Sequence, residues 1–330
     1  GSTMNLKNLA ILCALGCVST AGWAQEAPKI QNLRFTEDWS NFDPSESDHW
    51  SAPLKKIEIS DSVWVSIGGE QRVRYENWNN FGFGAANDDD FTLFRTQLHA
   101  DIHVGDQWRA FIEGRMNTVN NRTLPGGKRA GLDIDEGDFG NAFIEGKFEA
   151  FNSALTLRLG RQELQFGKQR LVSPLDWANN RRLFDGGVLN IKGDSGYTAD
   201  FFVTSPVSVN PQELTLNDTN DDTLFSGMYY NRAVTDKTQM DAYVFARNAR
   251  HNTGLEEDRF TLGGRYFGKC NDALSFDSEL AYQFGDQEIG DKDIEAWMLT
   301  LEGTYAFADV AWTPAVTLGV DYATGDDDAA

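Results

Sequence analysis

The connections between the apolar segments of this chain alternate between short and long. From Val63 onward, segments of about ten residues follow one another, and apolar and polar residues alternate within each. The short connections are Gly105 to Gln107, Ala150 to Ser153, Gly193 to Gly196, Val234 to Lys237, Lys269 to Ala273 and Phe307 to Ala311. The long connections are Asn77 to Phe91, Val119 to Asp138, Phe166 to Leu183, Pro206 to Thr223, Ala249 to Asp258 and Asp286 to Asp293. This order predicts an all-β chain that forms a transmembrane antiparallel β-barrel, because alternate strand ends lie in the periplasm and outside the cell.

The first segment shows the alternation most clearly. One face carries Val63, Val65, Ile67, Val73 and Tyr75, and the other carries Ser66, Glu70, Arg72, Arg74 and Glu76. A period of two predicts a strand with one apolar face and one polar face. In a barrel the apolar face contacts lipid and the polar face lines the lumen. Aromatic residues near the segment ends, among them Trp108 and Tyr266, are typical of interfacial girdles.

The number of segments predicts a longer protein. We count about thirteen strands, whereas bacterial single-chain barrels have an even number. The last residues, Thr324 to Ala330, are acidic and loop-like, and no final amphipathic strand ending in an aromatic residue is present. We expect the sequence to be a C-terminally truncated part of a barrel, because an open barrel would expose strand edges to lipid.

The N-terminal residues divide into three parts. Residues 1–24 combine an expression scar with a secretory signal peptide, in which Lys7 precedes a short apolar stretch and Gly22 to Ala24 form the cleavage site. A lipoprotein signal ending at Cys17 is the alternative. We expect residues 25–62 to form a periplasmic arm, with a disordered leader as the alternative, and residues 63–330 to form the barrel.

The charge and the cysteines limit the partners. The formal net charge of −21 disfavours nucleic acid. Removal of the signal leaves only Cys270, so no intramolecular disulfide is available. The acidic runs lie in the long connections, where they either solvate loop tips or bind Ca²⁺ that bridges lipopolysaccharide or neighbouring loops. Asp133 and Asp135 are weak candidates for such a metal site, and we expect no other cofactor.

Enzyme motifs are not found in the sequence. It contains no Gly-x-Ser-x-Gly, no His-Glu-x-x-His and no phosphate-binding loop. His99 and His103 share a strand face but lie about 13 Å apart along it, which is too far for both to bind one metal ion directly. We therefore expect no catalytic residues and no enzymatic activity.

Arginine is unusually frequent on the predicted lumen face. The strand positions are Arg72, Arg74, Arg95, Arg109, Arg115, Arg158, Arg247 and Arg265, and the connection from Phe166 to Leu183 adds Lys168, Arg170, Arg181 and Arg182. Such a set favours anions in a pore, because guanidinium binds carboxylate or phosphate with two parallel hydrogen bonds. Acids share these faces, so pairing across the wall is the expected role of many single arginines, with anion contact a property of the whole set.

Several motifs resemble the alginate-export family of outer-membrane porins. The matching runs are Leu157 to Leu164, Arg170 to Ser173, Asn179 to Gly186, Gly68 to Glu76 and Glu37 to Ser40. This resemblance covers most of residues 37–205, and beyond it only the run Tyr322 to Asp326 is similar to the family.

The resemblance implies an eighteen-stranded monomeric barrel whose arginine-rich pore passes alginate outward, with a loop that folds inward to constrict it. Arg72, Arg74, Arg158, Arg161, Arg181 and Arg182 lie in the matching motifs. Strict alternation would point Arg161 toward lipid, so either Gly160 introduces a bulge or Arg161 lies above the bilayer.

Three functions follow from these patterns. The first is an outer-membrane channel with an anion-favouring lumen for an acidic polysaccharide or its oligomers. The second is a general porin for small carboxylates or other anions. The third is a structural or adhesive barrel without transport. Expected partners are the transported anion, outer-membrane lipid and lipopolysaccharide, and periplasmic export proteins.

Overall fold

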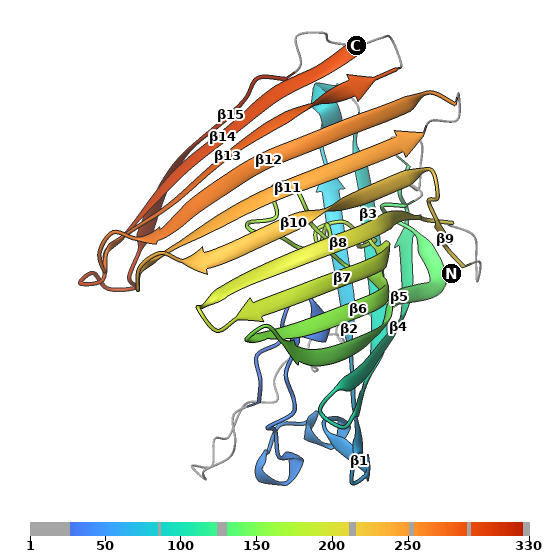
Figure 1. Ribbon diagram of the computed structural model, residues 1–330. Helices are drawn as coiled ribbons and strands as arrows, with labels where there is room; N and C mark the ends of the chain where they lie inside the picture. The colour runs from blue at the N-terminus through green and yellow to red at the C-terminus, as the bar shows by residue number, and fades with distance from the viewer. Residues whose placement is uncertain are drawn as a thin grey trace.

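The computed structural model describes residues 27–84, 87–123, 131–210, 216–250, 254–288 and 292–325, and these contain one strongly curved antiparallel sheet (Figure 1). Its strands are β1 Ile57–Ser60, β2 Val63–Trp78, β3 Asp89–Val104, β4 Trp108–Asn120, β5 Asp135–Ala150, β6 Ser153–Gln162, β7 Phe184–Gly193, β8 Tyr197–Ser208, β9 Asp218–Thr219, β10 Thr223–Ala233, β11 Thr238–Arg250, β12 Glu256–Lys269, β13 Leu274–Gln287, β14 Lys292–Ala306 and β15 Ala315–Ala323. Short 3₁₀ turns are η2 Arg34–Thr36, η3 Pro44–Glu46, η4 Ala52–Leu54 and η5 Phe81–Phe83. In the described residues, no helix has the length and apolarity to cross a membrane.

Each strand pairs with its neighbours in chain order. The order runs from β1 to β15 without a crossover, and the two-residue strand β9 pairs only with β8. The all-β antiparallel architecture and the thirteen longer strands that the sequence predicts are therefore confirmed. The sequence did not reveal β1 and β9, because two to four residues are too few to show a period of two.

Two of the predicted long connections are much shorter in the structure. Strand β11 continues to Arg250 and β12 begins at Glu256, while β13 and β14 leave only residues 288–291 between them. At the start of β12 the acidic residues that suggested a loop continue the strand, because arginines of the paired strand β11 neutralise them. Arg250 pairs with Glu256 at 2.8 Å, and Arg247 pairs with Glu257 at 2.6 Å.

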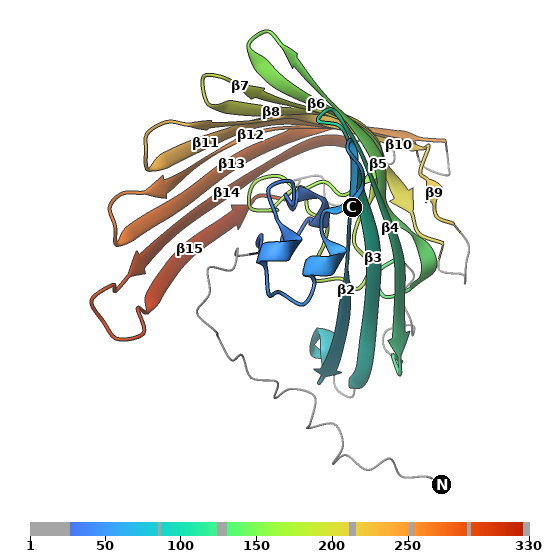
Figure 2. The same cartoon turned by 90° about the horizontal axis from the view of Figure 1, so that it is seen from below.

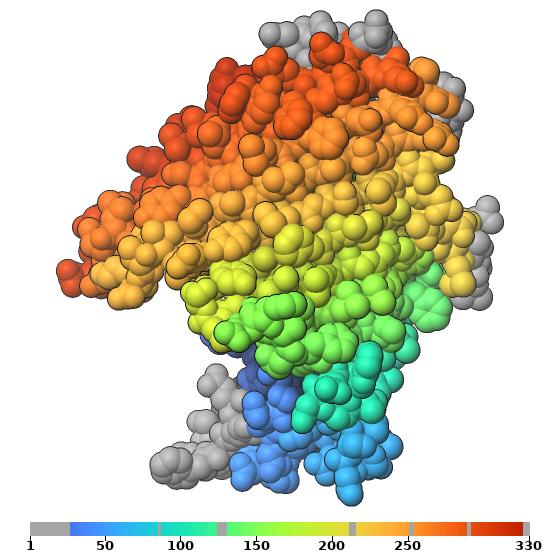
Figure 3. All heavy atoms as spheres, viewed as in Figure 1, coloured from blue at the N-terminus to red at the C-terminus, as the bar shows by residue number. Residues whose placement is uncertain are grey.

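The two faces of the sheet divide as the alternation predicts. On β3, Leu98 is 64% exposed, whereas its neighbours Gln97 and Arg95 are 6% and 2% exposed. Ile144 on β5 and Met116 on β4 are likewise about half exposed. Figure 3 shows the outer faces of β6 to β14 as a continuous surface. The apolar side chains therefore face outward, and the polar side chains lie beneath other parts of the chain.

Leu98→Arg should lower the free energy of unfolding by about 2–4 kcal/mol if Leu98 contacts the middle of the bilayer, because the bilayer solvates a guanidinium poorly. Urea titration of the protein folded into lipid vesicles measures this. Leu98→Ala is the matched control for the loss of the leucine side chain alone. A stability equal to that of Leu98→Ala would show that this face does not contact lipid.

The inward face is not uniformly polar. Phe202, Tyr229, Tyr243 and Phe245 of β8, β10 and β11 form an apolar cluster with Phe184 and Val188 of β7. A period of two reveals which residues share a face, but here both faces of β8 carry phenylalanine, Phe201 outward and Phe202 inward. The inward phenylalanines need a covering segment, and residues 164–172 supply it.

The residues before β1 fold into a compact arm on the inner side of the sheet (Figure 2). Trp39, Phe42 and Ala52 form a small core of their own, in which the Trp39 and Phe42 rings meet edge to face with centroids 5.1 Å apart. The Lys55 ammonium lies 4.4 Å above the Trp39 ring. The arm enters the sheet through β1, which pairs with β2.

Candidate functional site

The segment between β6 and β7, residues 163–183, lies inside the curve of the sheet, and we call it the inner loop (Figure 2). It contacts the walls formed by β2 to β4, by β8, β10 and β11, and by β13 and β14. The family resemblance implies a loop that folds inward, and the inner loop lies in such a position. It contains Arg181 and Arg182.

Arginines of β2 and β3 hold the tip of the inner loop by its backbone. Arg72 donates to the carbonyl oxygens of Asp176 and Ala178, both at 2.8 Å. Its cross-strand partner Arg95 donates to the carbonyl of Asp176 at 3.0 Å and pairs with the Asp176 carboxylate at 2.9 Å and with Glu70 at 2.7 Å. The Arg72 and Arg95 guanidinium groups can lie side by side because loop carbonyl oxygens and the carboxylates of Asp176 and Glu70 compensate their positive charges.

Arg74 lies next to this pair and contacts the same tip. Its guanidinium stacks over the Trp177 ring at 4.5 Å, donates to the Trp177 carbonyl and pairs with Glu76 at 2.7 Å. Arg72 and Arg74 thus contact the loop through their guanidinium groups.

Asn179 and Asn180 fix the following residues of the inner loop to β3, to β4 and to the segment just before β5. The Asn179 amide donates to the carbonyl oxygens of Phe94, Thr118 and Asp133 at 2.8 to 3.1 Å. The Asn180 amide donates to the carbonyl of Ile134 at 2.7 Å. Both asparagines are almost fully buried, so these contacts act as a clasp rather than as a solvent-exposed surface.

The first half of the inner loop is held by aromatic packing. The Phe166 ring stacks on Tyr229 with centroids 5.0 Å apart and on Phe202 at 5.3 Å. Leu164 and Val172 are buried in the same cluster. Such packing contributes both buried apolar area and favourable ring geometry, so this half of the loop is a fixed part of the inner wall.

Basic residues of the inner loop cross to the opposite wall. Arg170 pairs with Glu279 at 2.5 Å and with Asp277 at 3.1 Å on β13, and Lys168 pairs with Glu302 of β14 at 2.7 Å. Arg265 of β12 belongs to this group, because it pairs with Asp277 and with Asp241 of β11. Arg247 lies nearer the outer rim with its side chain 42% exposed, paired with Glu257.

A second group of arginines surrounds Glu145 on β5. Arg109 of β4 pairs with Glu145 at 2.9 Å and with Asp101 at 2.7 Å, and Arg158 of β6 pairs with Glu145 at 2.6 Å. All of these side chains face inward and are largely buried. The sequence suggested that single arginines pair with acids across the wall, and Arg109 and Arg158 both do so.

The remaining sequence-predicted arginines lie near the ends of the inner loop. Arg115 pairs with Asp135 at 2.5 Å and donates to the Arg181 carbonyl at 3.1 Å. Arg181 pairs with Glu163 at 2.6 Å and with Asp176. Arg182 is exposed, and its backbone N–H donates to the Pro174 carbonyl at 2.8 Å.

Arg161 does not lie on the inward face. It shares the side of β6 that carries Leu157 and Leu159, and it pairs with Asp185 at 2.8 Å and with Asp138 at 3.3 Å. The suggested bulge at Gly160 is wrong, because the register of β6 with β5 and β7 is unbroken there. The Arg161 guanidinium also donates to the Asn217 carbonyl at 2.9 Å. This contact lies beside β9, at the end of β6 that leads into the inner loop. Register shifts occur instead between β4 and β5 and between β1 and β2.

The candidate metal ligands Asp133 and Asp135 are engaged by arginines. Asp133 pairs with Arg122 at 3.1 Å, and Asp135 accepts from Arg115 and from Asn217. In the parts of the chain that the structure describes, no group of three His, Cys, Asp or Glu side chains is arranged to hold a metal ion. The acidic run Asp326 to Asp328 lies outside the described residues.

Asp176 joins the tip of the inner loop to its base. Burial raises the pKa of this carboxyl. The Arg181 and Arg95 guanidinium groups together lower it by more than burial raises it, so the net pKa lies below its usual range. A lowered pKa means that the contact stabilises the folded loop above the usual carboxyl pKa and is lost as the pH falls through the lowered value.

We therefore expect current noise from the inner loop to stay constant from neutral pH to about pH 4 and to rise only below it. Asp176→Asn should already show at neutral pH the raised current noise that the unchanged protein shows only in acid. Single-channel recording against pH measures both. Equal noise in Asp176→Asn and in the unchanged protein at neutral pH would contradict a role of the carboxylate in holding the loop.

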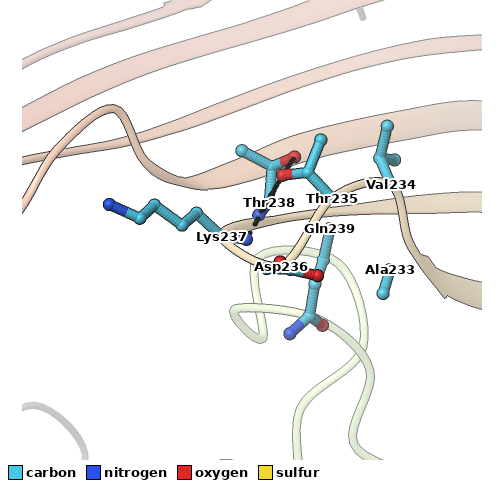
Figure 4. A pocket seen from close by; sticks show the side chains of 7 residues that line it. All are labelled: Ala233, Val234, Thr235, Asp236, Lys237, Thr238 and Gln239. Atoms are coloured by element: carbon cyan, nitrogen blue, oxygen red, sulfur yellow. Dashed lines mark hydrogen bonds between the residues drawn. The ribbon is translucent and has the colours of Figure 1, made fainter.

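A small hollow at the β10–β11 turn is a separate feature (Figure 4). Its volume is about 350 Å³, and only residues 233–239 of the turn line it. The Thr235 and Thr238 hydroxyls are hydrogen-bonded to each other at 2.8 Å and close the turn. The hollow shares no residue with the arginine groups and forms no part of the candidate site.

An antiparallel sheet with an apolar outer face and a charged inner wall crossed by a loop defines the class of outer-membrane β-barrel channels. The family described as Alginate export matches residues 63–330, and the chain belongs to this family. Family membership places the protein in the outer membrane of a Gram-negative bacterium and indicates transport rather than catalysis.

Solved structures with some similarity are also outer-membrane proteins. A loop L8 deletion mutant of OmpT from Vibrio cholerae has a TM-score of 0.39 and 12% identity, with 81% of this chain and 96% of that chain covered. An anion-selective porin from Comamonas acidovorans has a TM-score of 0.35 and 11% identity, with 81% and 90% covered. A likeness at this level supports no functional argument. The comparison with curated proteins finds no match.

The sequence did not reveal several residues that build the site. Phe166, Asn179 and Asn180 hold the inner loop. The run from Asn179 to Gly186 matches a family motif, but its clasp depends on carbonyl groups of β3, of β4 and of the segment before β5. A local pattern contains no signal for such contacts.

Proposed function

We propose that this channel favours anions and passes an acidic polysaccharide of the alginate type or its oligomers. The family description supports a polysaccharide. The charge of the inner loop supports anion preference, and it is the observation on which the proposal mainly rests.

The inner loop is basic in an acidic chain. Residues 163–183 contain Lys168, Arg170, Arg181 and Arg182 but only Glu163 and Asp176 as acids, so the loop carries 4 − 2 = +2 charges while the chain carries −21. Arg72 adds a charge that loop carbonyl oxygens bind, and no described carboxylate forms an ion pair with it. Lys168 and Arg170 pair with acids of β13 and β14. Among the described residues, Arg72 and Arg182 are therefore the basic groups that an anion passing the loop would meet without a paired carboxylate.

Arginine remains able to bind an anion even when it is paired. A guanidinium has five N–H donors, and a carboxylate pair uses only some of them. A uronate chain presents one carboxylate per sugar, so successive arginines along the inner wall could exchange partners with it. Salt bridges between wall residues compensate the arginine charges while no anion is bound.

Ion selectivity tests the proposal. In planar bilayers with a KCl gradient, the full-length protein should give a reversal potential of the anion-selective sign. The double variant Arg72→Gln with Arg182→Gln should shift the potential toward cation selectivity. The matched control is Arg250→Gln, which removes an exposed arginine at the rim. Cation selectivity that the double variant leaves unchanged would contradict the proposal.

Uptake of small carboxylates is the second candidate. A cavity of about 450 Å³ is lined by Arg115, Arg181 and Arg182 and by no acidic residue. Its size suits a small organic acid better than a polymer. Oligouronates should block the current at lower concentration than monomeric uronate if the polymer is the substrate. Equal potency of the two would favour the general porin.

Calcium bridging at the acidic outer loops and binding of lipopolysaccharide remain part of the proposal. If Ca²⁺ binds there, a chelator should lower the melting temperature of the protein in lipopolysaccharide-containing vesicles, and added Ca²⁺ should restore it. An identical melting temperature in chelator and in Ca²⁺ would remove calcium from the proposal.

A further inference from the structure

The arm before β1 inserts one aromatic side chain into the inner wall. Phe35 is 3% exposed, and its ring meets Phe143 and Phe111 edge to face, with centroids 5.3 and 6.1 Å away. Phe111 and Phe143 occupy inward positions of β4 and β5, where the alternation predicts polar residues. These two rings form a socket, and Phe35 fills it.

The charged residues around Glu145 hold the same side chain. The Arg158 guanidinium stacks on the Phe35 ring at 4.2 Å. Arg109 donates to the Phe35 carbonyl oxygen at 2.7 Å. The wall therefore binds the arm through its backbone as well as through the ring, which is the arrangement of a docked segment and not of a passing linker.

The arm is also connected to the inner loop. Arg181 of the loop donates to the side-chain oxygen of Asn32 at 3.0 Å and to its carbonyl at 3.1 Å. The Asn32 amide donates to Gln165 at 2.9 Å. Because Arg181 also pairs with Glu163 and Asp176, one arginine joins the base of the loop, its tip and the arm.

The arm narrows the inner space on the side of the short turns. The Ser62 carbonyl, at the turn that joins the arm to β2, accepts from the Gly105 N–H of the β3–β4 turn, and short turns of such barrels face the periplasm. A cavity of about 700 Å³ remains between the arm, the wall and the inner loop. Its lining includes Phe35, Arg158, Lys192 and Phe166.

We propose that residues 31–42 are a plug that closes the periplasmic half of the lumen and, through the Asn32–Arg181 contact, keeps the inner loop in its constricting position. Release of Phe35 from its socket removes the plug and frees one of the partners of Arg181. The channel therefore opens when the arm is displaced toward the periplasm. This device depends on the chain being a channel but not on which ions it prefers.

The plug is built for release. It docks through the Phe35 ring, the neighbouring Leu33 side chain and a few hydrogen bonds. Trp39 and Phe42 pack instead with Ala52 of the arm and with Trp64 of β2, so they form the hinge side of the segment. A folded segment that docks by a small contact can move as a unit, which is the usual basis of hinged switches.

A reversible cross-link tests the plug. Asn32→Cys and Gln165→Cys, made with Cys270→Ser to remove the native thiol, place two thiols where the present side chains touch. A disulfide or a short bis-thiosulfonate linker then locks the arm to the loop. In planar bilayers the locked protein should show a low conductance. Reduction should raise the conductance to at least the value of the Cys270→Ser protein, because Asn32→Cys also removes the side-chain contact with Arg181.

Phe35→Ala should raise the conductance severalfold, and the cross-link added to this variant should suppress the rise. Ile59→Ala is the matched control, since Ile59 is an exposed residue of β1 outside the docking contact. Urea titration establishes that each variant is folded. If folded Phe35→Ala conducts like the unchanged protein whether locked or reduced, the plug is overturned. Reversal potentials from the same recordings report selectivity separately, so failure of the anion proposal would be distinguishable.

Discussion

Excision of residues 164–182, with a short glycine-serine linker joining Glu163 to Leu183, should raise the single-channel conductance severalfold. The inner loop contacts three walls of the lumen, so its removal widens the passage at the level where Arg72 and Arg170 now hold it. The strands that flank the excision pair with each other along their whole length. The β6–β7 register runs from Ser153 opposite Gly193 to Gln162 opposite Phe184. The barrel wall should therefore survive the change.

Trp177→Ala is the matched control within the loop. Trp177 is 77% exposed, and its ring contacts the Arg74 guanidinium. Its loss should leave the conductance near the original value, because the backbone contacts of Asp176 and Ala178 remain. Should the excised protein fold, as urea titration reports, and conduct no better than the control, the inner loop would not be the constriction.

The barrel strands were predictable because each is a local pattern. Val63 to Glu76 shows which face contacts lipid without any knowledge of its neighbours, and the same holds for β3 and β4. The strand ends were not predictable at Glu256 and Glu257. Acidic runs are typical of loops, and only the partners Arg250 and Arg247 on the adjacent strand convert these two into strand residues.

The candidate site was predictable as a set but not in its partners. Arginine on an inward face is visible in the sequence, whereas the carbonyl oxygens that bind Arg72 lie more than a hundred positions away. Phe35 gives no local signal either, because its socket consists of inward phenylalanines on two distant strands. Contacts of this kind follow from the strong curvature of the sheet, which brings separate connections together on its inner side.

Glu145→Gln should strongly destabilise the folded protein. Glu145 is 3% exposed and pairs with both Arg109 and Arg158. Removing its charge leaves Arg109 with Asp101 as its remaining ion-pair partner and leaves Arg158 with only the more distant Asp200 carboxylate. Loss of one partner in a buried ion pair costs about 3–5 kcal/mol, because the remaining charge stays out of water without compensation.

The measurement is urea unfolding of the protein in lipid vesicles, with Glu149→Gln as the control on the same strand. Glu149 is exposed, so neutralising it should change the free energy of unfolding by less than about 1 kcal/mol. Because Arg109 and Arg158 also hold Phe35, the Glu145 variant should release the arm and show the raised conductance of Phe35→Ala. A loss of stability without a rise in conductance would show that the ion pairs around Glu145 do not hold the plug. An unchanged free energy of unfolding would show that water enters the wall and screens these charges.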